Sequence, residues 1–268
     1  MSERFLQWLY NDTTRKLIRA TGLRPLVSEY YWRARYHRTG QYSTQSVAET
    51  EIDFFTESYE EFLRFQNLVG ERDVIRDLIR GLNDDDIVYD VGANVGMYTC
   101  FIVTHLHSGT VVAFEPVSKN AERLNENLEL NGLDAEIIQM VLSDTNGTID
   151  ISLTGEEAGE GEHAIATDDD AETIEVETAK GDSIIERRNL PTPTVVKIDV
   201  EGAELSVLRG LRETLRENCR LVYVEVHPEK ITDFGANAPE VREFLEELEF
   251  DVEKLTQRGS EVFLRASK

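Results

Sequence analysis

The sequence contains few cysteines, few lysines and no long hydrophobic segment. Its only cysteines, Cys100 and Cys219, lie in apolar surroundings, away from any CxxC or Cys/His cluster. A disulfide framework and a structural zinc site are therefore not expected, and the cytoplasm is the expected compartment. No stretch approaches the ~18 uninterrupted apolar residues of a membrane-spanning helix. The N-terminal segment lacks the apolar run and cleavage site of a secretory signal, so we expect none.

Basic residues are also scarce. The 268 residues include 28 Lys+Arg, of which seven are lysine, and 52 Asp+Glu, giving a formal net charge of −24. Such a surface suits a cytoplasm of very high salt, where the Debye length falls to about 3 Å at 1 M and self-repulsion is screened. The acidity argues against nucleic acid as a partner, because neutralising phosphates needs a basic face. The apolar fraction of 40% supplies a core and excludes a wholly disordered chain.

Residues 1–40 differ from the rest. They hold eight basic and three acidic residues together with seven aromatic ones, whereas the remainder of the chain carries a charge of −29. A basic, aromatic helix of this kind can bind peripherally to the inner face of an anionic membrane, or it can bind a partner. The alternative is a helical cap that packs on the main domain.

Apolar periodicity predicts a helix over residues 50–81. Phe54, Phe55, Tyr59 and Phe62 begin an apolar face that Val74–Ile79 continues, and Gly81 ends the segment. We therefore expect two parts, an N-terminal helical, basic and aromatic segment over residues 1–80 and a main domain over residues 81–268.

From residue 87 onward, strands and helices alternate. Strands are predicted over residues 87–91, 110–114, 137–142, 195–200 and 221–226, with helices between them. Residues 148–153 and 173–178 alternate like an antiparallel pair, and residues 154–172 between them hold eight acids and no Lys or Arg, as in a solvated loop. Residues 250–255 and 261–264 predict a terminal hairpin. The fold class is therefore α/β, a doubly wound and mostly parallel sheet whose last strand is reversed in a C-terminal hairpin.

The segment IVYDVGANVG over residues 87–96 predicts a nucleotide-type site. A strand turns through Gly92, Asn94 and Gly96 into a helix, and the helix N-terminus presents unpaired N–H groups. Glu115 ends the second strand, 23 residues after Gly92, where its carboxylate can accept hydrogen bonds from a ribose diol. Together these features select a ligand that contains adenosine.

The same turn favours S-adenosylmethionine (SAM) over a dinucleotide. A dinucleotide fingerprint is G-x-G-x-x-G, but Asn94 occupies the middle glycine position, and Asp90 would oppose a pyrophosphate. Asp90 is better placed against the ammonium of an amino-acid moiety, which SAM carries. Asp144, after the third strand, either accepts from the adenine amine or serves as a turn residue before Asn146-Gly147.

The acceptor side of the site is predicted from the ends of the next two strands. Asp199 and Glu201 lie two residues apart, so they share a face while the segment is extended, and His227 ends the following strand. Such groups can orient an acceptor and remove its proton. The alternatives are that Glu201 or Glu204 caps a helix and that His227 forms a structural hydrogen bond. These residue types can also bind a divalent metal, as can Glu225, but the sequence requires none.

These segments resemble the FkbM family of SAM-dependent methyltransferases. The resemblance is carried by DVGANVGMYT, AFEP, VLSD, KIDVEGAELSVLRG and LVYVEVHP, between about residues 81 and 265, and KIDVEGAE is its most specific piece. It implies a Rossmann-like seven-stranded sheet, SAM as cofactor, and O-methylation of a hydroxyl on a sugar, glycan or secondary metabolite. It identifies neither the acceptor nor the oligomeric state.

Three other functions compete with this interpretation. An NAD-dependent oxidoreductase is disfavoured by Asn94 and Asp90. A nucleic-acid amino-methyltransferase would resemble this fold but carry an N/D-P-P-Y/F turn where this chain has DVEG. The non-enzymatic alternative is a SAM-binding or membrane-docked interaction module that uses residues 1–40.

Overall fold

The computed structural model describes residues 33, 36, 42–57, 62, 65, 71–152 and 173–268. The chain divides into two compact units, residues 1–44 with 54–67 and residues 45–53 with 68–268. In the first unit the Phe54 and Phe65 rings stack with centroids 4.8 Å apart, and the Tyr36 and Phe62 rings lie 5.6 Å apart. Most of residues 1–40 and all of residues 153–172 lie outside the described residues, so the membrane contact and the solvated loop stay predictions.

A two-stranded sheet replaces the first part of the helix predicted over residues 50–81. Strands β1 (Tyr42–Val47) and β2 (Thr50–Phe55) pair across Ala48 and Glu49, which have φ values of 49° and 69°. Positive φ at both positions is typical of a type I′ turn, which usually carries Asn-Gly. The helical prediction was therefore wrong for residues 50–55. Its last part is confirmed, because α5 (Glu71–Gly81) buries Val74, Ile75, Leu78 and Ile79.

The main sheet has seven strands in the order β11-β12-β10-β9-β3-β4-β5. The strands are β3 (Ile87–Val91), β4 (Thr110–Phe114), β5 (Glu136–Ile138), β9 (Val195–Ile198), β10 (Leu221–Val226), β11 (Asp251–Arg258) and β12 (Glu261–Ser267). Strands β5, β4, β3, β9 and β10 are parallel, and β12 runs antiparallel to both β10 and β11. This confirms the predicted doubly wound sheet with a reversed hairpin strand. The strand order reverses between β3 and β9.

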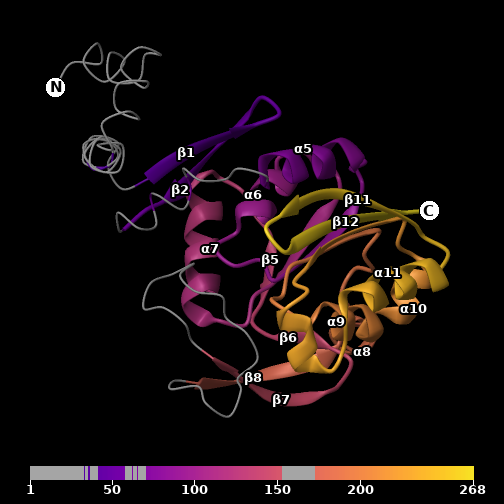
Figure 1. Cartoon of the computed structure of the whole chain (residues 1–268). Coiled ribbons are helices and arrows are strands. Elements are labelled where there is room, and N and C mark those ends of the chain that lie inside the picture. The colour runs from indigo at the N-terminus through magenta and orange to yellow at the C-terminus, as the bar shows by residue number, and fades with distance from the viewer. Residues whose placement is uncertain are drawn as a thin grey trace, which may run out of the picture. The chain divides into compact units, whose positions relative to one another are not determined.

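Helices cover both faces of this sheet. Figure 1 shows α5, α6 (Met97–Val103) and α7 (Ser118–Leu130) on one side, and α8 (Gly181–Arg188), α9 (Glu204–Gly210), α10 (Arg212–Glu217) and α11 (Ala238–Glu247) on the other. Every residue of β9 and β10 is buried, as continuous apolar strands require when both faces are covered. The short 3₁₀ helix η1 (Lys230–Phe234) follows β10.

The third predicted strand, residues 137–142, is two strands in two sheets. After β5, the chain passes through Met140 into β6 (Val141–Ser143), which pairs with β8 (Thr173–Lys180) in a three-stranded sheet of order β6-β8-β7. Met140 is fully buried, so the apolar pattern continues through the change of sheet and gives no sign of it. Strand β7 (Gly147–Ser152) pairs antiparallel with β8, as predicted.

Both cysteines lie in the core, as the sequence predicts. Cys100 and Cys219 are both buried and not joined by a disulfide. Within the described part of the chain, no helix is both long and apolar enough to cross a membrane.

Candidate active site

A cavity lies beyond the carboxyl ends of β3, β4 and β9, where the strand order reverses. It contains about 780 Å³ of empty space, including open solvent at its mouth. One part of its wall is polar and another is apolar; the lining residues are Val91, Gly92, Asn94, Phe114, Glu115, Pro116, Asn120, Met140, Val141, Leu142, Ile151, Asp199, Val200, Glu201 and Ala203. Ligands of doubly wound folds bind at this place, so the predicted location of the site agrees with the cavity.

The glycine turn at the base of the cavity is required by close packing. Gly92 has a φ of +76°, and a Cβ atom there would lie 1.8 Å from the Asp199 carbonyl oxygen. Gly96 has a φ of +86°, and a Cβ atom there would lie 2.9 Å from Leu124 Cγ on α7. Gly92 thus lets the turn approach the end of β9. Gly96 does not line the cavity, and its absent side chain leaves room for Leu124 of α7.

Glu115 is a buried carboxylate in the cavity wall. Its Oε2 atom accepts a hydrogen bond from the Asn94 backbone N–H at 2.8 Å, and Oε1 accepts from the Val117 N–H at 3.0 Å and the Asn120 amide at 3.4 Å. Burial raises the pKa of Glu115 to about 7, although these hydrogen bonds act in the opposite direction. The carboxylate is thus fixed at the place from which the sequence predicts ribose recognition.

Asp90 occupies a different environment from the one expected. It is fully buried and does not line the cavity; its Oδ1 atom lies 3.1 Å from Lys197 Nζ, and its Oδ2 atom accepts from the Thr99 hydroxyl at 2.6 Å. Lys197 Nζ also donates to the Gly92 carbonyl oxygen at 3.2 Å. Asp90 therefore holds Lys197, and Lys197 holds the glycine turn.

Lys197 is a site residue that the sequence reasoning missed. It lies on β9, directly beside Asp90 of β3 in the parallel register, and its side chain is almost completely buried. Burial alone would lower the pKa of Lys197, but the charges of Asp90 and Asp199 outweigh burial and raise it. The sequence does contain a signal for this role: Lys197 interrupts an otherwise continuous apolar strand, as Asp90 does on the neighbouring strand.

Asp144 is half-buried at the end of β6 and does not line the cavity. Its Oδ1 atom accepts a weak hydrogen bond from the Ser143 hydroxyl at 3.4 Å. The neighbouring cavity wall is apolar and is formed by Phe114, Met140, Leu142 and Ile151. A planar base fits such a wall, whereas contact between Asp144 and an adenine amine stays a prediction.

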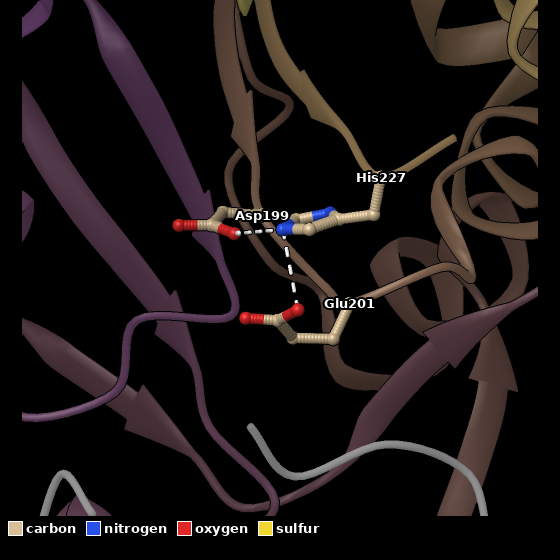
Figure 2. A group of neighbouring side chains, drawn as sticks. All are labelled: Asp199, Glu201 and His227. Atoms are coloured by element: carbon tan, nitrogen blue, oxygen red, sulfur yellow. Dashed lines mark ion pairs between the residues drawn. The ribbon is translucent and has the colours of Figure 1, made fainter. Parts of the chain in front are cut away.

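The second polar group lies where β9 and β10 end. Figure 2 shows the side chains of Asp199, Glu201 and His227 pointing toward one another. His227 Nε2 lies 3.2 Å from Glu201 Oε2 and 4.0 Å from Asp199 Oδ1. The sequence predicts an extended segment that places the two carboxylates on one face. That prediction is wrong, because β9 ends at Ile198 and Glu201 has a left-handed φ of 52°. The turn brings them together.

Glu204 fixes the other side of the His227 ring. Its Oε1 atom lies 2.6 Å from His227 Nδ1 and accepts from the Gly202 N–H at 2.9 Å, and its side chain is fully buried. The sequence offered Glu204 only as a helix cap. Its second role depends on the position of β10, which is remote in sequence, so no local pattern could reveal it.

The charges around His227 change its expected chemistry. Burial alone would lower the pKa of His227, but the hydrogen bond to Glu204 and the charges of Glu201 and Asp199 outweigh burial and raise it to about 9. With that pKa the ring is an imidazolium at neutral pH and cannot accept a proton. A group that removes a proton near neutral pH is then one of the carboxylates that line the cavity.

Glu225 does not join this cluster. Its Oε1 atom lies 2.6 Å from an Arg258 guanidinium nitrogen, and Arg258 also binds Glu71 at 2.7 Å. Burial and the charge of Asp199 raise the pKa of Glu225 to about 8, against the opposing effect of Arg258. Glu225 therefore connects β10 to the terminal hairpin and is not available as the fourth ligand considered from the sequence.

Comparisons with known proteins agree with the fold and show the family of the chain. The chain matches the Methyltransferase FkbM domain over residues 90–252. It is 32% identical to hexuronic acid methyltransferase AglP of Haloferax volcanii over 219 residues, which cover 81% of this chain and 86% of that protein. It is 28% identical to 31-O-demethyl-FK506 methyltransferase FkbM of Streptomyces tacrolimicus over 176 residues, 54% of this chain and 67% of that protein.

A solved structure supports the same conclusion for the fold. Methyltransferase FkbM from Methylobacillus flagellatus superimposes with a TM-score of 0.50 at 16% identity, and the match covers 71% of this chain. The chain spans about half the length of that protein, with 46% covered. The domain match includes the glycine turn, Glu115 and the cluster at the ends of β9 and β10, and with the AglP relative it establishes that the chain belongs to the FkbM family of methyltransferases.

Proposed function

We propose that this methyltransferase transfers the methyl group of SAM to an oxygen of a sugar or of another hydroxyl-bearing metabolite. The proposal rests on one observation: Glu115, Asp199 and Glu201 line the same cavity. Glu115 is suited to bind a nucleoside, and the pair Asp199 and Glu201 is suited to bind an acceptor. One compartment can thus bring donor and acceptor together. Positioning of this kind accounts for a large share of the acceleration of a displacement reaction.

The described residues fit SAM. Gly92 lines the cavity and presents only backbone there, because the lack of a side chain lets the turn pack against the Asp199 carbonyl oxygen. Glu115 offers two fixed oxygens to the ribose hydroxyls, and the wall formed by Phe114, Leu142 and Ile151 accepts the adenine ring. Asn94 borders this pocket, and Asp90 acts indirectly, by holding Lys197 against the Gly92 carbonyl oxygen.

The chemistry that the bound group supplies is a methyl group on a positively charged sulfur. The protein must align the acceptor oxygen with that methyl, exclude water and assist the loss of the hydroxyl proton. Asp199 and Glu201 line the cavity and are suited to orient the acceptor and take its proton. His227 and Lys230 lie against Glu201 at 3.2 and 2.6 Å, so they hold its carboxylate in place.

A sugar acceptor is supported by the AglP relative, which is named for a hexuronic acid and matches most of both chains. A hexuronic acid has hydroxyl and carboxylate oxygens, and either can receive a methyl group. We propose a hydroxyl, because the carboxylates at the acceptor end repel a second carboxylate and can accept a proton from a hydroxyl.

Mass spectrometry of glycans and small metabolites from cells with and without the protein tests this function. We expect a product heavier by 14 Da, the mass of one added methylene, only where the protein is present. The added methyl should survive mild alkali as an ether, whereas a methyl ester would be hydrolysed. Absence of any methylated compound would contradict the function, and an alkali-labile methyl group would contradict the hydroxyl acceptor.

Ligand titration, combined with product analysis, separates this proposal from two of the three alternatives, the NAD-dependent oxidoreductase and the module that only binds SAM. S-adenosylhomocysteine should bind in calorimetry, while NAD and NADH should not. A module that only binds SAM would show the same binding but would yield no methylated product.

A further inference from the structure

We propose that Asp199, Glu201 and His227 form a binding site for a divalent cation at the acceptor end of the cavity. The inference deepens the proposed function, because the ion would lie beside the acceptor. Each of the three side chains offers one ligand atom, and these atoms all lie within 4.8 Å of one another. They come from the ends of two adjacent parallel strands, and Figure 2 shows them converging on one point.

The separations fit a small divalent ion. Ligand atoms about 2.1–2.5 Å from a central ion lie about 3–3.5 Å apart when adjacent and about 4.2–5 Å apart when opposite. His227 Nε2 lies 3.2 Å from Glu201 Oε2, the spacing of adjacent ligands, and 4.0 Å from Asp199 Oδ1, between the adjacent and opposite spacings. One imidazole nitrogen and two carboxylate oxygens form a mixed donor set that suits Mn²⁺ well.

Glu204 provides a second observation that does not depend on the cluster of ligands. Its carboxylate, which is fully buried on α9, lies 2.6 Å from His227 Nδ1. The ring donates its Nδ1–H to Glu204, and a cation that displaced the Nε2 proton would meet the Nε2 lone pair directed toward Asp199 and Glu201. A histidine that binds a metal almost always donates its other ring N–H to a carboxylate or carbonyl in this way.

The charges nearby favour a cation, and they identify its competitor. Asp90, Asp199, Glu201 and Glu204 surround this end of β9, and the Lys197 ammonium lies against Asp90 and Asp199. The Lys230 ammonium lies 2.6 Å from Glu201 Oε2 and therefore occupies part of the same carboxylate. A divalent ion would share Glu201 with Lys230, so removal of that ammonium should strengthen ion binding.

The position of the ion indicates its ligand chemistry. Three protein ligands leave the other coordination positions of a six-coordinate ion to water or to the acceptor. Asp199 and Glu201 line the cavity, so these positions face the space for the acceptor. The site therefore selects acceptors in which the methylated hydroxyl has a second oxygen close by, as in a sugar diol or a sugar acid.

Mn²⁺ binding to the full-length protein tests the proposal. Free Mn²⁺ would be counted by electron paramagnetic resonance in ~1 M KCl, which suppresses non-specific binding to so acidic a surface. We expect one saturable Mn²⁺ per chain. Asp199→Asn and His227→Gln should weaken binding at least ~10-fold, and Glu204→Gln by roughly 10–100-fold through loss of the ring's partner. Lys230→Met should tighten binding by on the order of 10-fold.

Controls make the result specific. Glu229→Gln removes an exposed charge next to Lys230 and should leave Mn²⁺ binding unchanged. Pulsed resonance spectra should show coupling of Mn²⁺ to an imidazole nitrogen, and His227→Gln should abolish it. Calorimetry with S-adenosylhomocysteine verifies that each variant is folded. If the other variants do not fold, Lys230→Met still tests the site, because it should increase the affinity for Mn²⁺.

The outcomes separate this inference from the proposed function. Absence of saturable Mn²⁺ binding, or equal binding by the wild type and all variants, would overturn the cation site even if methyl transfer proceeds. Saturable binding with the expected pattern would support the site even if none of the tested acceptors is methylated.

Discussion

At the scale of single residues, the ionisation of Glu115 should control SAM affinity. Its pKa is raised to about 7 by burial, and only the ionised carboxylate can accept hydrogen bonds from both ribose hydroxyls. Affinity for S-adenosylhomocysteine should therefore increase as the pH rises through 7, by roughly 10-fold between pH 6 and pH 8. Calorimetry over this range measures the effect.

Two variants show whether Glu115 causes that dependence. Glu115→Gln should bind about 10-fold or more weakly and lose the pH dependence, because one acceptor oxygen becomes an amide donor. Glu122→Gln, on the exposed face of α7, should behave like the wild type. An equally steep profile in Glu115→Gln would remove Glu115 from ribose recognition.

His227 should matter for the methyl-transfer step and not for donor binding. Its ring contacts the carboxylates of Glu201 and Asp199 but does not itself line the cavity. His227→Ala should lower kcat by on the order of 100-fold while the affinity for S-adenosylhomocysteine changes little. Steady-state kinetics and calorimetry on the same preparation compare the two, and a variant with full turnover would reduce His227 to a structural role.

Some of these residues could be predicted from the sequence because their roles follow from strand ends. Glu115, Asp199 and Glu201 each follow a readable apolar strand, and all three line the cavity. Lys197 and Glu204 were not assigned, because their partners Asp90 and His227 are remote in sequence and meet them only in the folded chain. Asp90 lies on the predicted strand, but its carboxylate faces Lys197 and not the cavity in which the ammonium of SAM was expected. A hydrophobic pattern shows where a strand lies and does not show which side chain faces it.

At the scale of elements, the site depends on how closely β3 approaches β9. Gly92→Ala would place a Cβ atom 1.8 Å from the Asp199 carbonyl oxygen, so the two strand ends would have to separate. We expect a loss of more than about 3 kcal/mol in the free energy of unfolding. Urea denaturation followed by circular dichroism measures the loss.

Gly132 offers a matched comparison within the same chain. It has a φ of +64°, similar to the +76° of Gly92, but a Cβ atom there meets nothing within 4 Å. Gly132→Ala should therefore cost only the strain of the left-handed backbone, about 1 kcal/mol. Equal losses for the two variants would show that the approach of the strands does not matter.

The elements that the sequence did not predict share one cause. The buried face of β1 carries Ser43 and Gln45 beside Val47, so the strand lacks an apolar pattern. The turn Ala48-Glu49 lacks the glycine that usually marks a hairpin. The division of residues 137–142 between two sheets is likewise invisible, because both sheets bury apolar side chains. Tertiary packing outweighed local propensity at each of these places.

At the scale of the whole molecule, charge should dominate stability. The formal net charge of −24 produces self-repulsion that extends about 10 Å at 0.1 M salt and about 3 Å at 1 M. The melting temperature should therefore rise as KCl increases from about 0.1 to 3 M, most steeply below about 1 M. Differential scanning calorimetry records the change.

An uncharged solute separates screening from general exclusion effects. Sucrose at matched osmolality favours compact states by exclusion from the protein surface but does not screen charge. It should raise the melting temperature less than KCl does. A melting temperature that is independent of KCl would contradict adaptation to high salt.

The left-handed backbone of Glu201 has a consequence for how this enzyme could be made more robust. A side chain at φ 52° costs roughly 1–2 kcal/mol, which glycine would avoid. Glu201→Gly and Glu201→Ala lose the same carboxylate, so the glycine variant should unfold at higher urea, by about 1 kcal/mol in free energy. If the two variants are equally stable, the backbone there is relaxed. If the glycine variant is the more stable, a search for heat-tolerant variants would favour glycine at position 201 and lose the carboxylate proposed to act on the acceptor, so durability and turnover would compete at this one residue.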